Sequence, residues 1–173
     1  MHKTTADRLI EVESLPLQDT GAPLPTVVSS DSQLLLAYIV SEPDPAWDGD
    51  PTSLSPATPD RQVAIVRFHL PFSHSFGPPN DEALDGHPLS SRGLKPYSWF
   101  EVRDSSWIQS LERMNSVHPR HRPDSFKAYR HYIATFHDST FECVARGFDV
   151  QLHRGSVRSA VERMTELLGE GAA

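Results

Sequence analysis

The segment from His131 to Ala145 limits the possible fold more than any other, because two short apolar runs flank the polar tetrad His137–Thr140. Turn-forming residues between runs rich in aromatic and β-branched residues predict a β-hairpin. A turn of even length, such as the tetrad itself, places Phe136 opposite Phe141 on one apolar face. That face is expected to lie on the core.

The opposite face of the same hairpin carries the groups that could do chemistry. An even turn groups His137 with Glu142, whereas a three-residue turn would bury Glu142 without a partner, at a high cost in free energy. A histidine beside a glutamate can act as a general base with its orienting carboxylate, or as two metal ligands. The same pair can instead form a structural cross-strand salt bridge, and a structural role is favoured. His137 and Glu142 are therefore the candidate catalytic pair, to be weighed against that structural role.

The remaining apolar runs predict an α+β fold. Short runs with β-branched and aromatic residues predict strands, and the continuous run over Gln33–Val40 predicts a central strand that is covered on both faces. Apolar residues at helical spacing predict two amphipathic helices, one over 106–115 and one that begins after Ser156. We expect a mainly antiparallel sheet of five to six strands with the two helices packed on one side. The other predicted strands are Gln62–Leu70, Tyr97–Arg103 and Phe148–His153.

The chain is expected to form a single domain over residues 1–173. Prolines break up the first part, so residues from 1 to about 24 are predicted to form a mobile arm on the surface. Residues 41–60 are rich in proline, acidic and small polar residues, which is typical of a mobile insertion. Apolar runs flank this insertion, so it is predicted to link two neighbouring strands.

Residues 71–96 are predicted to form a second long loop, which mixes aromatic anchors with carboxylates and imidazoles. Loops of this kind are often functional. A transition metal is compatible with these side chains, but their spacing matches no standard metal motif, so no metal is assigned and the cofactor stays unknown. The candidate ligand-binding residues are His69, Glu82, His87 and Arg67, and the candidate metal ligands are His74, His87, His137 and Glu142.

Composition narrows the function classes. The net charge of −7 provides no basic field, so nucleic acid is an unfavourable partner. Cys143 is the single cysteine and cannot form an intramolecular disulfide. The longest apolar run is too short to span a bilayer, and the first residues lack the apolar core of a signal peptide. These features predict a soluble cytoplasmic protein without a membrane partner, and the excess of arginine over lysine suggests a bacterial source.

Three functions are compatible with the sequence. The first is a small binding or accessory domain for a small molecule or a protein, with a polar site between the 71–96 loop and the 131–146 hairpin. The second is an enzyme with acid–base or metal-assisted chemistry, which needs His137, Glu142, Glu82 and His87 close together. The third is an interaction subunit that pairs through an exposed edge strand at 148–153. The oligomeric state is left open.

Overall fold

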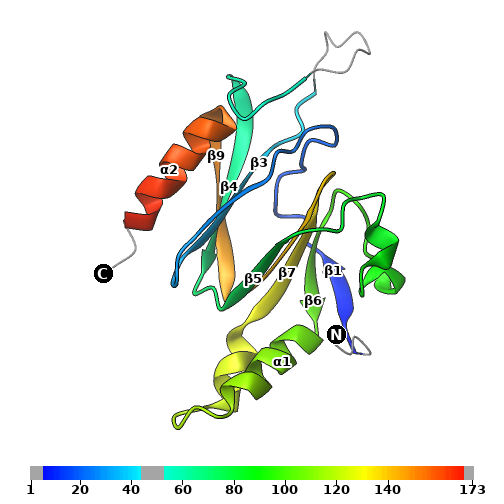
Figure 1. Cartoon of the computed structure of the whole chain (residues 1–173), viewed down its shortest axis with the longest axis vertical. Coiled ribbons are helices and arrows are strands. Elements are labelled where there is room, and N and C mark those ends of the chain that lie inside the picture. The colour runs from blue at the N-terminus through cyan, green and yellow to red at the C-terminus, as the bar shows by residue number, and fades with distance from the viewer. Residues whose placement is uncertain (1–5, 44–52, 170–173) are drawn as a thin grey trace.

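Nine antiparallel strands are divided between two sheets in the part of the chain that the computed structural model describes, residues 6–43 and 53–169. The hydrogen-bonded orders are β1-β6-β7-β8-β5 and β2-β3-β4-β9. Figure 1 shows the four-stranded sheet in the upper part of the view and the five-stranded sheet below it. The strands are β1 (Arg8–Glu11), β2 (Thr26–Ser29), β3 (Leu34–Ile39), β4 (Arg61–His69), β5 (Ser73–Gly77), β6 (Trp99–Arg103), β7 (Arg130–Thr135), β8 (Thr140–Ala145) and β9 (Gly147–Gly155).

The main core lies between the two sheets. Aromatic rings from both sheets meet there, and Phe68 of β4 contacts Tyr132 of β7 and Phe141 of β8. All six residues of β3 are buried, because alternate side chains enter this core and the remaining ones face a second apolar cluster. The prediction of a central strand covered on both faces is confirmed.

Helix α2 (Val157–Gly169) covers the outer face of the four-stranded sheet. Its residues Val157, Ala160 and Met164 are buried against Val63 and Ile65 of β4. Burying a valine or methionine side chain contributes about 1.5–3 kcal/mol, so this packing holds the helix in place. Neither helix in the described chain combines the length and the apolar character needed to cross a bilayer.

The outer face of the five-stranded sheet is covered in two pieces. The first contains the short 3-10 helices η1 (Leu84–Gly86) and η2 (Ser90–Arg92), and its leucines pack on β6 and β7. The second is α1 (Ser106–Asn115) together with η3 (Pro123–Ala128), which packs on Val144 of β8. The two coverings are separate apolar clusters, and the candidate site lies between them.

The predicted α+β class is confirmed, and each helix packs on one side of its own sheet. The strands are shared between two sheets, an arrangement that the apolar runs did not specify. The predicted helix over 106–115 is confirmed, and Ser105 is its N-cap because its side chain accepts a hydrogen bond from the Ile108 N–H at 3.2 Å. Met114, near the end of this helix, is 63% exposed.

The predicted hairpin forms, but its register was wrong. Thr135 pairs with Thr140 and Ala134 with Phe141, so the four-residue loop is 136–139, one residue earlier than predicted. Thr140 is held in the ladder from its other side, where it pairs with Gly77 of β5, and its hydroxyl donates to the Pro79 carbonyl at 2.9 Å. The side chains nevertheless keep their predicted faces, because the pairing shifts by two residues in total.

The proline-rich start of the chain is part of the fold, which corrects the expectation of a surface arm for the described residues. Strand β1 pairs with β6, and Leu15 is buried in the core between the sheets. The Tyr38 hydroxyl also donates a hydrogen bond to the Pro16 carbonyl at 2.8 Å. Prolines excluded a helix here but did not prevent extended pairing at a sheet edge.

The two long connections differ from each other. The 41–60 segment links β3 and β4, which pair as neighbours as predicted, and its residues 44–52 lie outside the described residues. The 71–96 segment is not an unstructured loop, since it contributes β5 and the helices η1 and η2. Its leucines are the physical reason, because Leu84, Leu89 and Leu94 anchor it on the sheet.

Candidate functional site

A cavity of about 330 Å³ lies on the outer face of the five-stranded sheet, where its lining comes from β5, β7, β8, the start of α1 and the segment between η1 and η2. We call it the histidine pocket. Its volume is at the lower end of the range typical of small-molecule sites. The lining residues are Asp7, Ser75, His87, Pro88, Leu89, Ser106, Trp107, His131 and Glu142.

Glu142 is the centre of the polar network in the histidine pocket. Its Oε2 lies 2.8 Å from Nε2 of His131, and its Oε1 lies 3.3 Å from Nε2 of His87. Burial raises the pKa of the Glu142 carboxyl group, but the hydrogen bonds and charges of His131 and His87 outweigh burial and bring the pKa down to about 2. Glu142 is therefore an ionised carboxylate at neutral pH, with 22% of its side chain exposed.

Backbone and side-chain donors fix the orientation of both imidazoles. The Leu89 N–H donates to Nδ1 of His87 at 3.1 Å, which makes Nε2 the proton-bearing nitrogen of the neutral ring. Nδ1 of His131 lies 2.9 Å from the hydroxyl oxygen of Ser105. With Nε2 of His131 donating to Glu142, the neutral ring accepts at Nδ1 from the Ser105 hydroxyl. The network therefore runs from Ser105 through His131 to Glu142, and His87 joins from the other side.

A serine, a histidine and a carboxylate in this order also form the relay used in nucleophilic catalysis. Here the hydroxyl of Ser105 has both of its roles occupied: it accepts the Ile108 N–H as N-cap and faces His131. Ser105 is only 3% exposed. The arrangement therefore positions the Glu142 carboxylate and couples it to the start of α1, and it does not present a free nucleophile.

Asp7 and Trp107 complete the wall beside α1. The Asp7 carboxylate is 3% exposed and accepts two hydrogen bonds from Ser106, from its N–H at 2.6 Å and from its hydroxyl at 2.8 Å. A carboxylate at a helix N-terminus is stabilised by the helix dipole. The Trp107 ring lies edge-on to the His131 ring, with 5.0 Å between the centroids. The pocket thus combines two carboxylates with an aromatic wall.

Among the predicted site residues, His87 and Glu142 come together in the histidine pocket, while His137 does not reach them. His137 lies at the hairpin tip, where its Nδ1 is 2.9 Å from Oδ1 of Asp138 and its side chain is 44% exposed. The hydrogen bond that the His137 ring donates to the Asp138 carboxylate raises the pKa of His137, and burial opposes this shift. Glu82 is exposed near this tip. The four-residue cluster that the enzyme hypothesis required is not formed.

The other predicted ligand residues lie elsewhere. Arg67 and His69 belong to β4 of the other sheet, where Nε2 of His69 is 2.7 Å from Oδ2 of Asp149. His74 is exposed on β5 and pairs across the strands with Cys143. In residues 6–43 and 53–169, no three His, Cys, Asp or Glu side chains converge as a metal site requires. His87 and His131 direct their Nε2 atoms at separate oxygens of one carboxylate instead of at a common point.

Sequence reasoning missed Asp7, Ser106, Trp107 and His131 as pocket residues. Strand parity already placed His131 on the face of Glu142, but the predicted register put Thr135 opposite Glu142. In the structure Ile133 is opposite Glu142, so His131 becomes its diagonal neighbour. For Asp7, nothing in its local sequence indicated a contact with a helix that begins 99 residues later.

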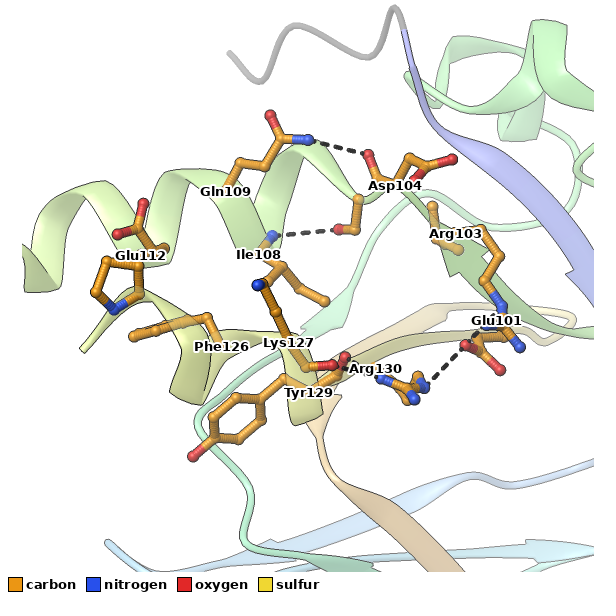
Figure 2. A pocket seen from close by; sticks show the side chains of 13 residues that line it. Glu101, Arg103, Asp104, Ile108, Gln109, Glu112, Phe126, Lys127, Tyr129 and Arg130 are labelled. Carbon is orange, nitrogen blue, oxygen red and sulfur yellow. Dashed lines mark hydrogen bonds and ion pairs between the residues drawn. The ribbon is translucent and has the colours of Figure 1, made fainter.

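A second cavity, of about 380 Å³, lies beside α1, η3 and strands β6 and β7. Figure 2 shows the guanidinium groups of Arg103 and Arg130 meeting at the Glu101 carboxylate, with distances of 2.9 and 3.4 Å. Asp104 likewise pairs with Arg8 and Lys127 with Asp124. The lining of this cavity carries three carboxylates and three fixed cations, so it offers a ligand no net charge: Glu101, Asp104 and Glu112 against Arg103, Lys127 and Arg130. The histidine pocket is the better candidate site.

Comparison of the chain with family models, curated proteins and solved structures gave no match, so the site must be interpreted from its own chemistry.

Proposed function

We propose that the protein is a small binding domain whose histidine pocket receives a small organic cation, such as an amine with a compact apolar body. The observation that carries this proposal is the ionised Glu142 carboxylate in the wall of a cavity that no lysine or arginine lines. A partly buried charge that is held only by imidazole donors gains free energy from a cationic partner. An anionic ligand would face Glu142 and Asp7 together.

The remaining walls suit the apolar part of such a ligand. Pro88, Leu89 and Trp107 contribute apolar surface. A cation near an indole face gains about 0.5–2 kcal/mol, depending on how far both groups are removed from water. A carboxylate offers about four lone-pair sites, and the two histidines occupy one on each oxygen of Glu142. Glu142 therefore keeps acceptor capacity for an ammonium group.

The test compares three probes of similar shape and different charge: 2-phenylethylamine, 2-phenylethanol and phenylacetate. Binding is followed by the indole N–H signal of Trp107 in two-dimensional NMR spectra, assigned with a Trp107→Phe variant. We expect saturable shifts with the amine, weaker shifts with the alcohol and none with phenylacetate. We also expect Glu142→Gln to weaken amine binding by at least about tenfold, which corresponds to about 1.4 kcal/mol.

The matched control is Glu82→Gln, which removes an exposed carboxylate outside the histidine pocket and should leave amine binding unchanged. Equal binding of the three probes, or equal binding by wild type and Glu142→Gln, would contradict recognition of a cation. Absence of binding by all three probes would contradict the pocket as a site for ligands of this class.

A further inference from the structure

Strand β9 is the long exposed edge of the four-stranded sheet. In the described chain the other edge strands are short, with four residues in β1 and β2 and five in β5, whereas β9 has nine. Short edge strands, prolines and lysines are common protections against pairing with another chain. Strand β9 has no proline and no lysine. Within the described residues, its outer edge forms no backbone hydrogen bond with another segment.

On the face toward the other sheet, the first three side chains of β9 are apolar and incompletely covered, and Arg154 follows them at the end of the strand. Phe148 packs against the main core, but Val150 and Leu152 on the same face are 37% and 54% exposed. Their partners in β4, Val66 and Ala64, are fully buried. The core therefore ends at β9 with apolar side chains that a further strand could cover.

We propose that two copies of this chain associate by antiparallel pairing of their β9 strands, with the two-fold axis at Gln151. In this register Val150 lies opposite Leu152 of the second copy, and the same pair repeats on the other side of the axis. On the opposite face of the sheet, Asp149 lies opposite His153 of the second copy. The Asp149 side chain is 78% exposed, and its Oδ2 already lies 2.7 Å from Nε2 of His69, so Oδ1 is the atom that meets the imidazole of the second copy. Nε2 of His153 lies 2.8 Å from the Ser159 hydroxyl, so this imidazole makes the contact through Nδ1.

This register is selected by complementarity. A shift of the axis by one residue toward the start of β9 pairs Val150 with itself and Asp149 with Gln151. A shift toward its end pairs Val150 with Arg154 and Leu152 with itself. Only the axis at Gln151 unites an apolar pair on one face with a carboxylate–imidazole pair on the other. The pairing joins the two four-stranded sheets into one continuous sheet and extends both cores across the interface.

The first measurement is the mass of the full chain in solution, by light scattering after gel filtration over a range of concentrations. We expect twice the chain mass for wild type and the mass of one chain for Leu152→Arg. The matched control is Leu17→Arg, at an apolar side chain that is 74% exposed outside β9, and it should keep the doubled mass. Circular dichroism confirms that each variant is folded.

The second measurement reads the register by oxidative cross-linking. Gln151→Cys places two thiols opposite each other at the axis, so we expect a covalent dimer under mild oxidation. Asp149→Cys alone should cross-link far more slowly, because its partner position is His153, and mixing it with His153→Cys should restore cross-linking. The native Cys143 is buried, so wild-type protein treated in the same way gives the background level of cross-linking. A wild-type mass of one chain at every concentration, or equal cross-linking of Gln151→Cys and Asp149→Cys, would overturn the proposal.

Discussion

The two ends of the β7–β8 hairpin carry the same kinds of residue in opposite surroundings. Near the base, His131 and Glu142 lie 2.8 Å apart with side chains that are 4% and 22% exposed. At the tip, His137 and Asp138 lie 2.9 Å apart with side chains that are 44% and 88% exposed. The distances are nearly equal, so geometry within each pair does not distinguish them.

Burial distinguishes the two pairs, because it determines what happens when one partner is lost. An exposed ion pair contributes about 0.2–1 kcal/mol, since water replaces either partner. A buried pair that loses one member leaves the other without solvation, which costs about 3–5 kcal/mol. The contribution of a histidine–carboxylate pair to stability therefore depends on how far other segments bury it. On this hairpin, the 71–96 segment and α1 bury His131 and Glu142.

The largest effect is expected from Glu142→Ala. This change leaves the Nε2 donors of both His87 and His131 without their acceptor in buried surroundings. We expect the free energy of unfolding to fall by about 2–4 kcal/mol, less than for a fully buried pair because Glu142 is partly exposed. Urea denaturation at neutral pH measures it. The matched change at the tip, Asp138→Ala, should cost less than about 0.5 kcal/mol, and similar losses for both variants would break the comparison.

The second prediction concerns the pH dependence of stability. The pKa of Glu142 is lowered in the folded protein from 4.5 to about 2, so the folded state favours the ionised form. This contribution is fully present above pH 4.5 and is lost as the pH falls toward 2. It amounts to about 3 kcal/mol, since each pKa unit corresponds to about 1.4 kcal/mol.

Denaturation of wild type and Glu142→Gln across this pH range isolates the contribution. The stability difference between the two proteins should shrink as the medium becomes acidic, because only wild type carries the titrating group. Asp138→Asn is the control at the hairpin tip and should follow the wild-type curve. A difference between wild type and Glu142→Gln that does not change with pH would show that Glu142 is not held ionised by its histidines.

The comparison also shows how far sequence reasoning reaches. The period-two pattern of the hairpin predicted which side chains share a face: it grouped His137 with Glu142 and Thr135, and it placed His131 further along the same face. It could not predict the register, because the loop position depends on pairing of Thr140 with Gly77 in a strand from a distant segment. The tip residue His137 was therefore chosen in place of His131.

The rest of the histidine pocket depends on contacts between segments far apart in the chain. Helix α1 was predicted from local signals, since apolar residues at helical spacing depend only on neighbouring positions in the chain. Asp7 binds the same helix start from 99 residues away, and no local pattern encodes that contact. Local physics thus predicted the elements, while the pocket arises from their tertiary assembly.

The third prediction tests the link between the histidine pocket and α1. Ser105→Ala removes both the N-cap of the helix and the group that faces Nδ1 of His131. We expect a loss of about 1–2 kcal/mol in the free energy of unfolding, from the cap and from a buried nitrogen left unpaired. Ser116→Ala, at the exposed other end of α1, is the control and should have little effect. An equally small effect of Ser105→Ala would mean that the network ends at His131.

The smallest effect is expected at the tip, where it can be measured best by titration. Asp138 raises the pKa of His137, so the protonated ring adds stability at low pH, and this contribution disappears as the pH rises through the raised pKa. Because both side chains are exposed, His137→Ala should change the free energy of unfolding by less than about 0.5 kcal/mol. NMR titration of the His137 ring should give a pKa above 6.5 in wild type and a lower value in Asp138→Asn. A clear loss of stability in His137→Ala would contradict this prediction. It would show that the imidazole also holds the neighbouring Tyr97 ring and its hydrogen bond to Asp81 in place.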